Sequence, residues 1–287
     1  MSADRFASGP PEGARADWTI DQGWERYTPG EHQVWVSLYE RQAALLEGRA
    51  CEPFLKGLKA LDLHGPGIPN FCEMNRKLRQ LTGWTVVAVP GLVPDEVFFD
   101  HLANRRFPAG RFIRTPDQLD YLEEPDVFHD VFGHVPMLTD PTFADYMKAY
   151  GEGGLKATRL GKLHNLARLY WYTVEFGLLD TPEGLRIYGA GIVSSHAESE
   201  FSLQDPSPNR LGFDLLRVMR TAYRIDDYQQ VYFVLPSLQR LLDDTLQDFG
   251  PLYEQLGRLP DIAIDAITPD DQVFTRGTQA YAKARAT

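Results

Sequence analysis

The sequence predicts a mainly α-helical protein with a few short β-strands. Apolar residues recur at helical spacing in several segments, and many of these segments begin at a capping residue. Runs of β-branched residues, by contrast, are few and short. The chain has 287 residues, of which 43% are hydrophobic, so it is long enough for one large domain or two small ones.

The composition of the chain bears on its binding partners, its location and the extent of its folded part. The formal net charge of −11 argues against nucleic acid, since phosphate binding calls for a basic surface. No apolar run reaches the roughly 18 residues that a membrane span requires. Cys51 and Cys72 make no disulfide framework, so reduced thiols and a cytoplasmic location are expected. Residues 1–17 are rich in Gly, Pro and Ala and are expected to form a disordered tail rather than a signal peptide, which leaves 18–287 as the folded part.

The first half of the chain predicts several helices and two short strands. Thr28, Pro29 and Glu31 form a helix start, with Thr28 as the cap and Glu31 reaching back to it. Asn70 caps a later helix that Gly83 stops. The other elements expected here are a helix over 51–61, a strand over 84–89, a helix from Pro94 and a strand edge over 111–114.

The second half predicts longer elements. Asp140 and Pro141 start a helix through Tyr150, and residues 151–154, which include three glycines, predict a turn. The remaining expectations are a helix over 158–179, a strand over 186–195 that ends in a polar turn, a strand over 230–235 and a helix from 238 to 246.

The stretch 124–136 places two histidines in an apolar run. His129 and His134 are five residues apart, so a regular helix would separate them by about 140° around its axis. Gly133 could end the helix in a left-handed conformation and Pro136 could prevent its continuation, which would let His134 swing back toward His129. Two such imidazoles point to a metal, and the alternative is a pair of unrelated core histidines bonded to the backbone.

Glu175 is a third candidate metal ligand. It stands in an apolar helical stripe beside Trp171, where an unpaired buried carboxylate would cost several kcal/mol. It should therefore be protonated, paired with an arginine or bound to a metal. Two histidines and one carboxylate form the facial triad of non-haem Fe(II) oxygenases, which leaves positions open for oxygen and a co-substrate. Catalytic zinc uses the same donors, but a zinc hydrolase usually needs a separate general base, for which Asp130 is the only local candidate.

A non-enzymatic alternative is a structural metal site in a binding protein. Such a site would require a fourth protein ligand. His164 and His196 are the only other histidines nearby, and neither has a suitable spacing. This alternative is therefore weaker than a catalytic metal site.

Three motifs, in the correct order, resemble those of the pterin-dependent aromatic amino acid hydroxylases. They are Glu124–Pro136, Trp171–Gly177 and Tyr188–Ser195, and the likeness extends from about Tyr27 to the region of Leu246. The resemblance implies a single α-rich catalytic domain with iron held by His129, His134 and Glu175. It implies a reaction in which a tetrahydropterin and O2 hydroxylate the ring of an aromatic amino acid.

The resemblance also implies the roles of other residues. Phe98 would stack on the pterin, whose binding residues would be Gly91, Leu92, Val93, Asp95, Phe98, Asp130 and Ala167. Arg114 would pair with the substrate carboxylate, and the substrate pocket would be completed by Trp171, Phe176, Gly191 and Ser194. Glu124 would bond to metal-bound water and Pro125 would pack beside the iron. Ser194 and Ser195 could also donate hydrogen bonds to a ligand imidazole, although a plain turn explains them equally well.

Three features of the sequence bear on specificity and assembly. Ile225 falls where tyrosine-hydroxylating members carry an aspartate, which favours phenylalanine as the substrate and leaves tryptophan open. Leu122 departs from the threonine of animal members. The chain lacks their regulatory domain and tetramerisation helix, so a monomer is expected.

Overall fold

The computed structural model describes residues 9–120 and 124–285, so Leu122 and residues 1–8 lie outside the described part. Helices predominate and the strands are short, as the sequence predicted. The chain forms two compact units, the first within Met1–Ala44 and Glu52–Lys156 and the second within Leu45–Cys51 and Ala157–Thr287. Among the described residues, no helix has both the length and the apolar character needed to cross a membrane.

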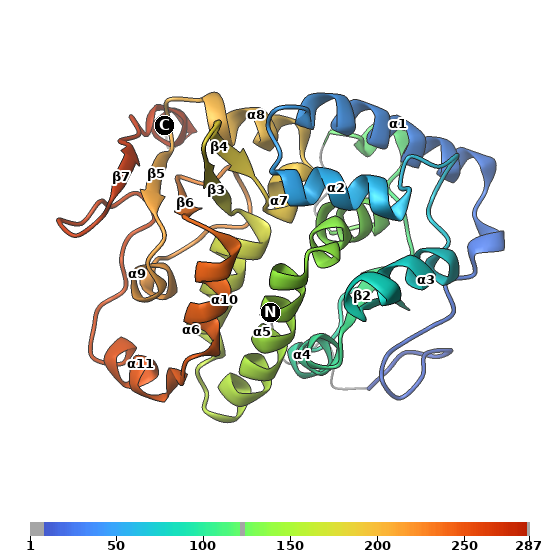
Figure 1. The fold of residues 1–287 in the computed structure, drawn as a ribbon, viewed down its shortest axis with the longest axis horizontal. Helices are drawn as coiled ribbons and strands as arrows, with labels where there is room; N and C mark the ends of the chain where they lie inside the picture. Colours follow the sequence, from blue (N-terminus) through green and yellow to red (C-terminus); the bar gives the residue numbers. More distant parts are fainter. Residues whose placement is uncertain (1–8, 121–123, 286–287) are drawn as a thin grey trace. The chain divides into compact units, whose positions relative to one another are not determined.

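The first unit combines helices with a small two-stranded parallel sheet (Figure 1). Strands β1 (Thr85–Val89) and β2 (Arg106–Gly110) pair in register from Thr85 opposite Arg106 to Val89 opposite Gly110. The α-helices are α1 (Pro29–Leu46), α2 (Glu52–Leu61), α3 (Phe71–Thr82), α4 (Asp95–Ala103) and α5 (Pro141–Arg159). Short 3-10 turns lie at Trp24–Arg26 and Pro116–Gln118.

Local chemistry sets the ends of these helices as predicted. The Thr28 amide donates to Glu31 Oε2 at 2.7 Å and the Glu31 amide donates to Thr28 Oγ1 at 3.2 Å, which is a reciprocal cap. The Asn70 side chain accepts from the Cys72 amide at the start of α3. Gly83 ends α3 with φ of 78°, a left-handed conformation that glycine adopts without a Cβ clash.

The strand predicted over 111–114 is wrong, because β2 lies earlier, at Arg106–Gly110. The backbone after β2 bonds to the segment that carries the histidines instead of to a strand. The Arg114 amide donates to Asp126 Oδ2 at 2.9 Å, and the Phe112 carbonyl accepts from the Val127 amide at 2.8 Å. These bonds fasten residues 112–114 beside the start of the histidine segment.

Residue 17, the predicted end of the tail, makes specific contacts in the first unit. The Asp17 carboxylate lies 3.1 Å from Arg106 Nη1, and the Asp17 carbonyl lies 2.9 Å from His101 Nε2. The Thr19 hydroxyl also donates to Asp17 Oδ1 at 2.7 Å. Asp17 is therefore bonded to both α4 and β2.

The turn predicted at residues 151–154 is also wrong, because α5 continues through it. A Cβ on Gly151 would lie 2.4 Å from the Ala103 amide nitrogen, and one on Gly154 would lie 2.0 Å from the Phe99 ring. The glycines allow α5 to approach α4 closely. Close packing of two helices, rather than chain reversal, explains this cluster.

The second unit is built on a five-stranded mixed sheet in the order β4-β3-β6-β5-β7. The central strand β6 (Val231–Leu235) is buried along its whole length, which confirms the strand predicted over 230–235. The other strands are β3 (Leu178–Thr181), β4 (Gly184–Ile187), β5 (Asn209–Gly212) and β7 (Val273–Thr275). The helices are α6 (Leu163–Tyr170), α7 (Ala190–Val193), α8 (His196–Gln204), α9 (Leu215–Arg220), α10 (Leu238–Leu246), α11 (Phe249–Leu256) and α12 (Ala280–Arg285).

Two long elements predicted in the second unit are each divided. Instead of one helix over 158–179, the chain breaks at Gly161, which has φ of 64°, and starts again as α6. Instead of a strand over 186–195, β4 ends at Ile187 and α7 begins at Ala190. Both divisions shape the segments that carry candidate site residues.

Candidate metal and substrate site

Both candidate histidines lie on a π-helix, Phe128–His134. A π-helix bonds residue i to i+5, so it brings residues five apart to the same face, unlike an α-helix. Gly133 is part of this helix and lacks a positive φ, so the left-handed ending predicted there is wrong. The chain continues directly into a 3-10 helix, Val135–Thr139, whose first turn includes Pro136.

The geometry of the two imidazoles suits a shared metal ion. Their Nε2 atoms lie 3.2 Å apart, and the rings are 83° from parallel. Two nitrogen donors about 2.1 Å from one ion and at right angles to each other lie about 3.0 Å apart. His134 is buried and its ring lies 4.9 Å from the Phe107 ring, while His129 is half-buried. The two donors therefore fit adjacent positions around one metal.

Asp126 holds Arg114 through a two-pronged ion pair. Arg114 Nε lies 2.9 Å from Oδ2 and Nη2 lies 3.0 Å from Oδ1, and both side chains are buried. Burial by itself would raise the pKa of Asp126, but the bonds and the charge of Arg114 outweigh it and lower that pKa below its ordinary value. Asp126 is therefore a carboxylate.

Asp126 also connects the arginine to the histidine segment. Its Oδ1 accepts from the His129 amide at 3.1 Å, so one carboxylate orients both a candidate substrate residue and the backbone of a candidate metal ligand. Sequence reasoning missed this role. The available signal was an acidic residue in the apolar run that contains His129, twelve residues after an arginine.

The guanidinium of Arg114 retains donors for a ligand. It has five N–H groups, of which two bond to Asp126 and a third, on Nη1, lies 3.4 Å from the Leu119 carbonyl. The described residues therefore leave two N–H groups on an arginine whose direction is already fixed. A fixed guanidinium with a pair of N–H groups is suited to a carboxylate.

The expected pterin residues of the first unit gather around β1, β2 and α4. Phe98 is half-buried and packs against Trp18, Val89 and Val93, whereas Phe99 is buried and lies 5.7 Å from the Tyr150 ring. The two adjacent phenylalanines therefore divide between a partly open side and the core. Gly91 and Leu92 are half-buried in the turn that follows β1, and Asp95 is exposed in the first turn of α4.

Three further candidates, Glu124, Pro125 and Asp130, lie close to the histidines in the sequence. Asp130 Oδ2 accepts from the Gly110 amide at 2.7 Å, which joins the π-helix to the end of β2. Glu124 is exposed and Pro125 is half-buried. A Cβ on Gly91 would lie 3.6 Å from Glu124 Oε1, so Glu124 lies near the turn after β1.

The carboxylate candidate of the second unit also ends a π-helix, Trp171–Glu175. Glu175 is half-buried, so it is less enclosed than the sequence suggested. Trp171 and Phe176 lie with ring centroids 4.8 Å apart. A Cβ on Gly191 would lie 2.8 Å from Phe176 Cζ, and one on Gly189 would lie 2.5 Å from the Glu175 carbonyl oxygen. Only glycine lets the chain before and within α7 pack this closely against Glu175 and Phe176.

The remaining candidates lie nearby in the same unit. Ser194 Oγ donates to the Ala190 carbonyl at 2.7 Å, and Ser195 Oγ accepts from the Glu198 amide at 3.3 Å as the cap of α8. Ala167 is half-buried on α6. The His164 side chain is 67% exposed, as expected for a solvated side chain.

Comparison with known proteins identifies a matching family and similar enzymes. Residues 24–280 match the family described as biopterin-dependent aromatic amino acid hydroxylase. A phenylalanine-4-hydroxylase from Caulobacter vibrioides is 71% identical, over 99% of this chain and 97% of that protein. One from Chromobacterium violaceum is 56% identical, over 91% of this chain and 88% of that protein.

Solved structures agree in fold. The iron- and phenylalanine-bound phenylalanine hydroxylase of C. violaceum matches with a TM-score of 0.87 and 53% identity, over 93% of this chain and 96% of that one. The structure of the same enzyme with iron(III) and 7,8-dihydrobiopterin matches with a TM-score of 0.87 and 55% identity, over 93% and 95%.

Proposed function

Since this chain belongs to the biopterin-dependent aromatic amino acid hydroxylases, we propose that it converts L-phenylalanine to L-tyrosine with O2, iron(II) and a tetrahydropterin. The observation that carries this proposal is the likeness, over nearly the whole chain, to enzymes named phenylalanine-4-hydroxylase. The solved structures of one such enzyme hold iron with phenylalanine and iron with dihydrobiopterin. Neither tryptophan as the substrate nor a zinc hydrolase has comparable support.

The proposed iron ligands are His129, His134 and Glu175. The Nε2 atoms of the two histidines have a separation that suits a shared ion. Both ligand-bearing segments are π-helices, an uncommon structure that often marks a functional site. Iron and tetrahydropterin supply oxygen activation and two electrons when bound, and the protein supplies orientation and exclusion of water.

The proposed substrate contacts are of two kinds, one to the carboxylate of the amino acid and the others to its aromatic ring. Arg114 binds the carboxylate of the amino acid with the N–H groups that Asp126 leaves available. The aromatic ring of the substrate lies against Trp171, Phe176, Gly191 and Ser194. Glu124, Pro125 and Ser195 support the metal ligands and their water.

For the pterin we propose stacking on Phe98, because that ring is the half-buried member of the Phe98–Phe99 pair. The other proposed contacts are Gly91, Leu92, Val93, Asp95, Asp130 and Ala167. The Gly110 amide fixes one oxygen of Asp130, so that carboxylate has a defined direction.

We further propose that the enzyme works in the cytoplasm as a monomer. Reduced cysteines fit that compartment, and Cys51 and Cys72 form no disulfide with each other. Light scattering over a range of protein concentrations tests the assembly, because a species larger than a monomer would contradict it.

The function is tested with protein that is purified without oxygen, loaded with Fe(II) and given tetrahydropterin, L-phenylalanine and air. We expect tyrosine, and we expect none when the pterin is omitted. Pterin consumption without tyrosine would contradict phenylalanine as the substrate and redirect the assay to tryptophan. Neither tyrosine nor pterin consumption would contradict the hydroxylase function.

A further inference from the structure

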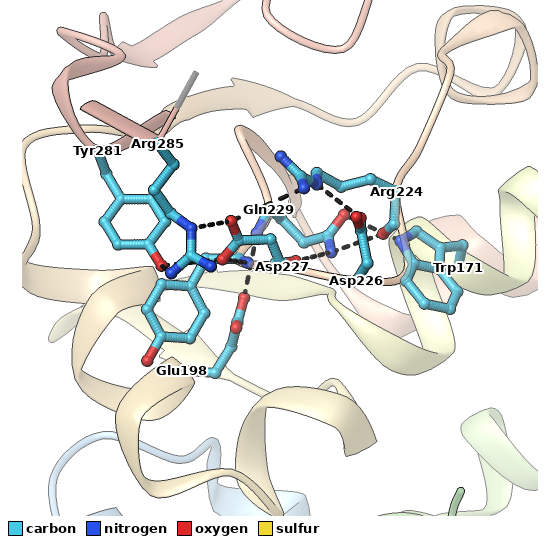
Figure 2. Close-up of polar contacts among 9 residues, drawn as sticks. Trp171, Glu198, Arg224, Asp226, Asp227, Gln229, Tyr281 and Arg285 are labelled. Atoms are coloured by element: carbon cyan, nitrogen blue, oxygen red, sulfur yellow. Dashed lines mark hydrogen bonds and ion pairs between the residues drawn. The ribbon is translucent and has the colours of Figure 1, made fainter. Parts of the chain in front are cut away.

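Gln229 is a buried side chain whose every polar group is used. It is 1% exposed, and its Oε1 accepts from Trp171 Nε1 at 2.9 Å. Its Nε2 donates to the Arg224 carbonyl at 3.1 Å and to the Asp227 carbonyl at 3.3 Å. The indole N–H can only donate, so the amide oxygen must face Trp171 and the amide nitrogen must face the carbonyls. Figure 2 shows Gln229 lying between Trp171 and the residues of its own loop.

The same loop holds the Trp171 ring from a second direction. The Tyr223 ring stacks on Trp171, with centroids 4.8 Å apart and planes at 28°. The position of the indole is thus set by a stacking partner and an acceptor that flank one short segment, Arg224–Tyr228. Movement of this segment would carry the Trp171 ring with it.

Asp227 fastens the segment to the C-terminal helix α12 (Figure 2). Its side chain is 8% exposed and lies 2.9 Å from Arg285 Nε. The Tyr281 hydroxyl donates to Asp227 Oδ1 at 2.9 Å, and the Tyr228 amide donates to the same oxygen at 2.9 Å. These three donors hold the Asp227 carboxylate between the loop and α12.

We propose that Gln229 is a positioning residue for the aromatic substrate: it fixes the Trp171 indole, and the Asp227 contacts with α12 hold Gln229 in place. The proposal rests on the proposed function, in which Trp171 lines the substrate pocket. It adds a specificity role for a residue outside that pocket and for the last described helix of the chain. Since the effect passes through the orientation of an aromatic wall, it should alter substrate affinity more than turnover.

The kinetic test uses the iron- and pterin-loaded enzyme with L-phenylalanine and with L-tryptophan. Gln229→Leu removes the acceptor at nearly constant size, and we expect the KM for phenylalanine to rise about tenfold, with kcat within about twofold. Gln239→Leu is the matched control, since Gln239 is an exposed glutamine on α10 whose Nε2 donates to Asp243 Oδ1 at 2.8 Å. It should leave both constants unchanged. An unchanged KM in Gln229→Leu would overturn the proposal.

A double-mutant cycle separates positioning from general loss of structure. Trp171→Phe keeps an aromatic ring but removes the indole N–H. If Gln229 acts through that N–H, adding Gln229→Leu to Trp171→Phe should change KM by less than about twofold. The same tenfold rise in both backgrounds would show that Gln229 acts by another route and would overturn the proposal.

The role of α12 is tested at its exposed end. Arg285→Gln removes the ion pair with Asp227, and we expect a two- to threefold rise in KM, on the scale of one partly exposed contact. Lys283→Gln, on the same helix, should have no effect, because Lys283 bonds to the Thr278 carbonyl and not to the loop. Equal effects of the two variants would contradict the role of α12.

One readout is independent of activity, so failure of the proposed function and failure of this inference can be told apart. In protein labelled with 15N-tryptophan, the Trp171 indole resonance is identified by its loss in Trp171→Phe. Gln229→Leu should shift that resonance and speed its exchange with solvent. An unmoved resonance would overturn the inference even in an active enzyme, whereas a moved one in an enzyme that makes no tyrosine would leave only the function in error.

Discussion

The Nε2 atoms of His129 and His134 lie 3.2 Å apart, although α-helical spacing would place these side chains about 140° apart. The π-helix Phe128–His134 removes the discrepancy by matching its repeat to the five-residue spacing. The motif therefore specifies a helix type as well as a pair of ligands. A residue inserted or deleted between the histidines would separate them again.

Removal of either histidine should abolish iron binding. We expect His129→Ala and His134→Ala each to lose the bound iron and to lower the rate of tyrosine formation by more than about a hundredfold, since even weaker outer contacts of metal sites are worth 10- to 100-fold. His164→Ala is the control, because that histidine is exposed. Iron content measured by atomic emission gives the answer, and full iron in either variant would refute the ligand assignment.

Asp126→Asn should weaken substrate binding and the fold together. It leaves the buried Arg114 without its anionic partner, which we expect to destabilise the protein by about 3 kcal/mol and to raise the KM for phenylalanine at least about tenfold. Asp145→Asn is the matched control, because Asp145 pairs with Arg105 at a partly exposed site. Urea unfolding and steady-state kinetics provide the two readouts. Equal, small effects in both variants would show that the Asp126 pair contributes little.

Alanine substitutions at two neighbouring glycines of α5 should change the stability of the protein in opposite directions. Gly154→Ala places a methyl group into the Phe99 ring and should destabilise the protein by about 1–3 kcal/mol. At Gly153 nothing lies within 4 Å of a Cβ, so Gly153→Ala should stabilise the helix by about 0.5–1 kcal/mol. Urea unfolding of the two variants measures the difference. Stabilisation by both would mean that α5 and α4 are not closely packed at Gly154.

Glu198 should make stability depend on pH. Burial raises its pKa from 4.5 to about 7, against the bond that it accepts from the Tyr232 hydroxyl. The folded state therefore holds a proton that the unfolded state releases, so this group favours folding at low pH, and that contribution is lost as pH rises from about 4.5 to about 7.

The variant Glu198→Gln lacks this titration. We expect its stability to match that of the unaltered protein near pH 4.5 and to exceed it by about 3 kcal/mol at pH 8. Unfolding by urea at a series of pH values measures the gap. A gap that stays constant with pH would disprove the raised pKa.

Sequence patterns predicted the ordinary helices well because their signals are local. Caps at Thr28 and Asn70 and the stop at Gly83 all act within one turn of the chain, and each lies where it was expected. The strand β6 was equally clear, since it is short, apolar and bounded by Pro236.

Several of the wrong predictions arose because contacts distant in sequence decided the structure. Gly151 and Gly154 indicate a turn by composition but serve the packing of α5 against α4. Gly189 and Gly191 lie where α7 meets the chain around Glu175, so the predicted strand is divided. The π-helices could not be foreseen, since no apolar period in the sequence distinguishes them from α-helices.

The site residues also divide into those that the sequence identified and those that only the folded chain reveals. The two histidines were identifiable from their residue types and spacing, and their Nε2 atoms do face each other. Asp126 was missed because its partner Arg114 is twelve residues away, and only the folded chain shows that the two bond. The roles of the pterin and substrate residues stay predictions.

The most direct test of the central claim is to trace the oxygen atom. The Fe(II)-loaded enzyme is given tetrahydropterin, L-phenylalanine and 18O2 in ordinary water, and the tyrosine formed is analysed by mass spectrometry. We expect each tyrosine to carry one 18O atom in its ring hydroxyl. Tyrosine that carries ordinary oxygen from water, or no tyrosine at all, would contradict it.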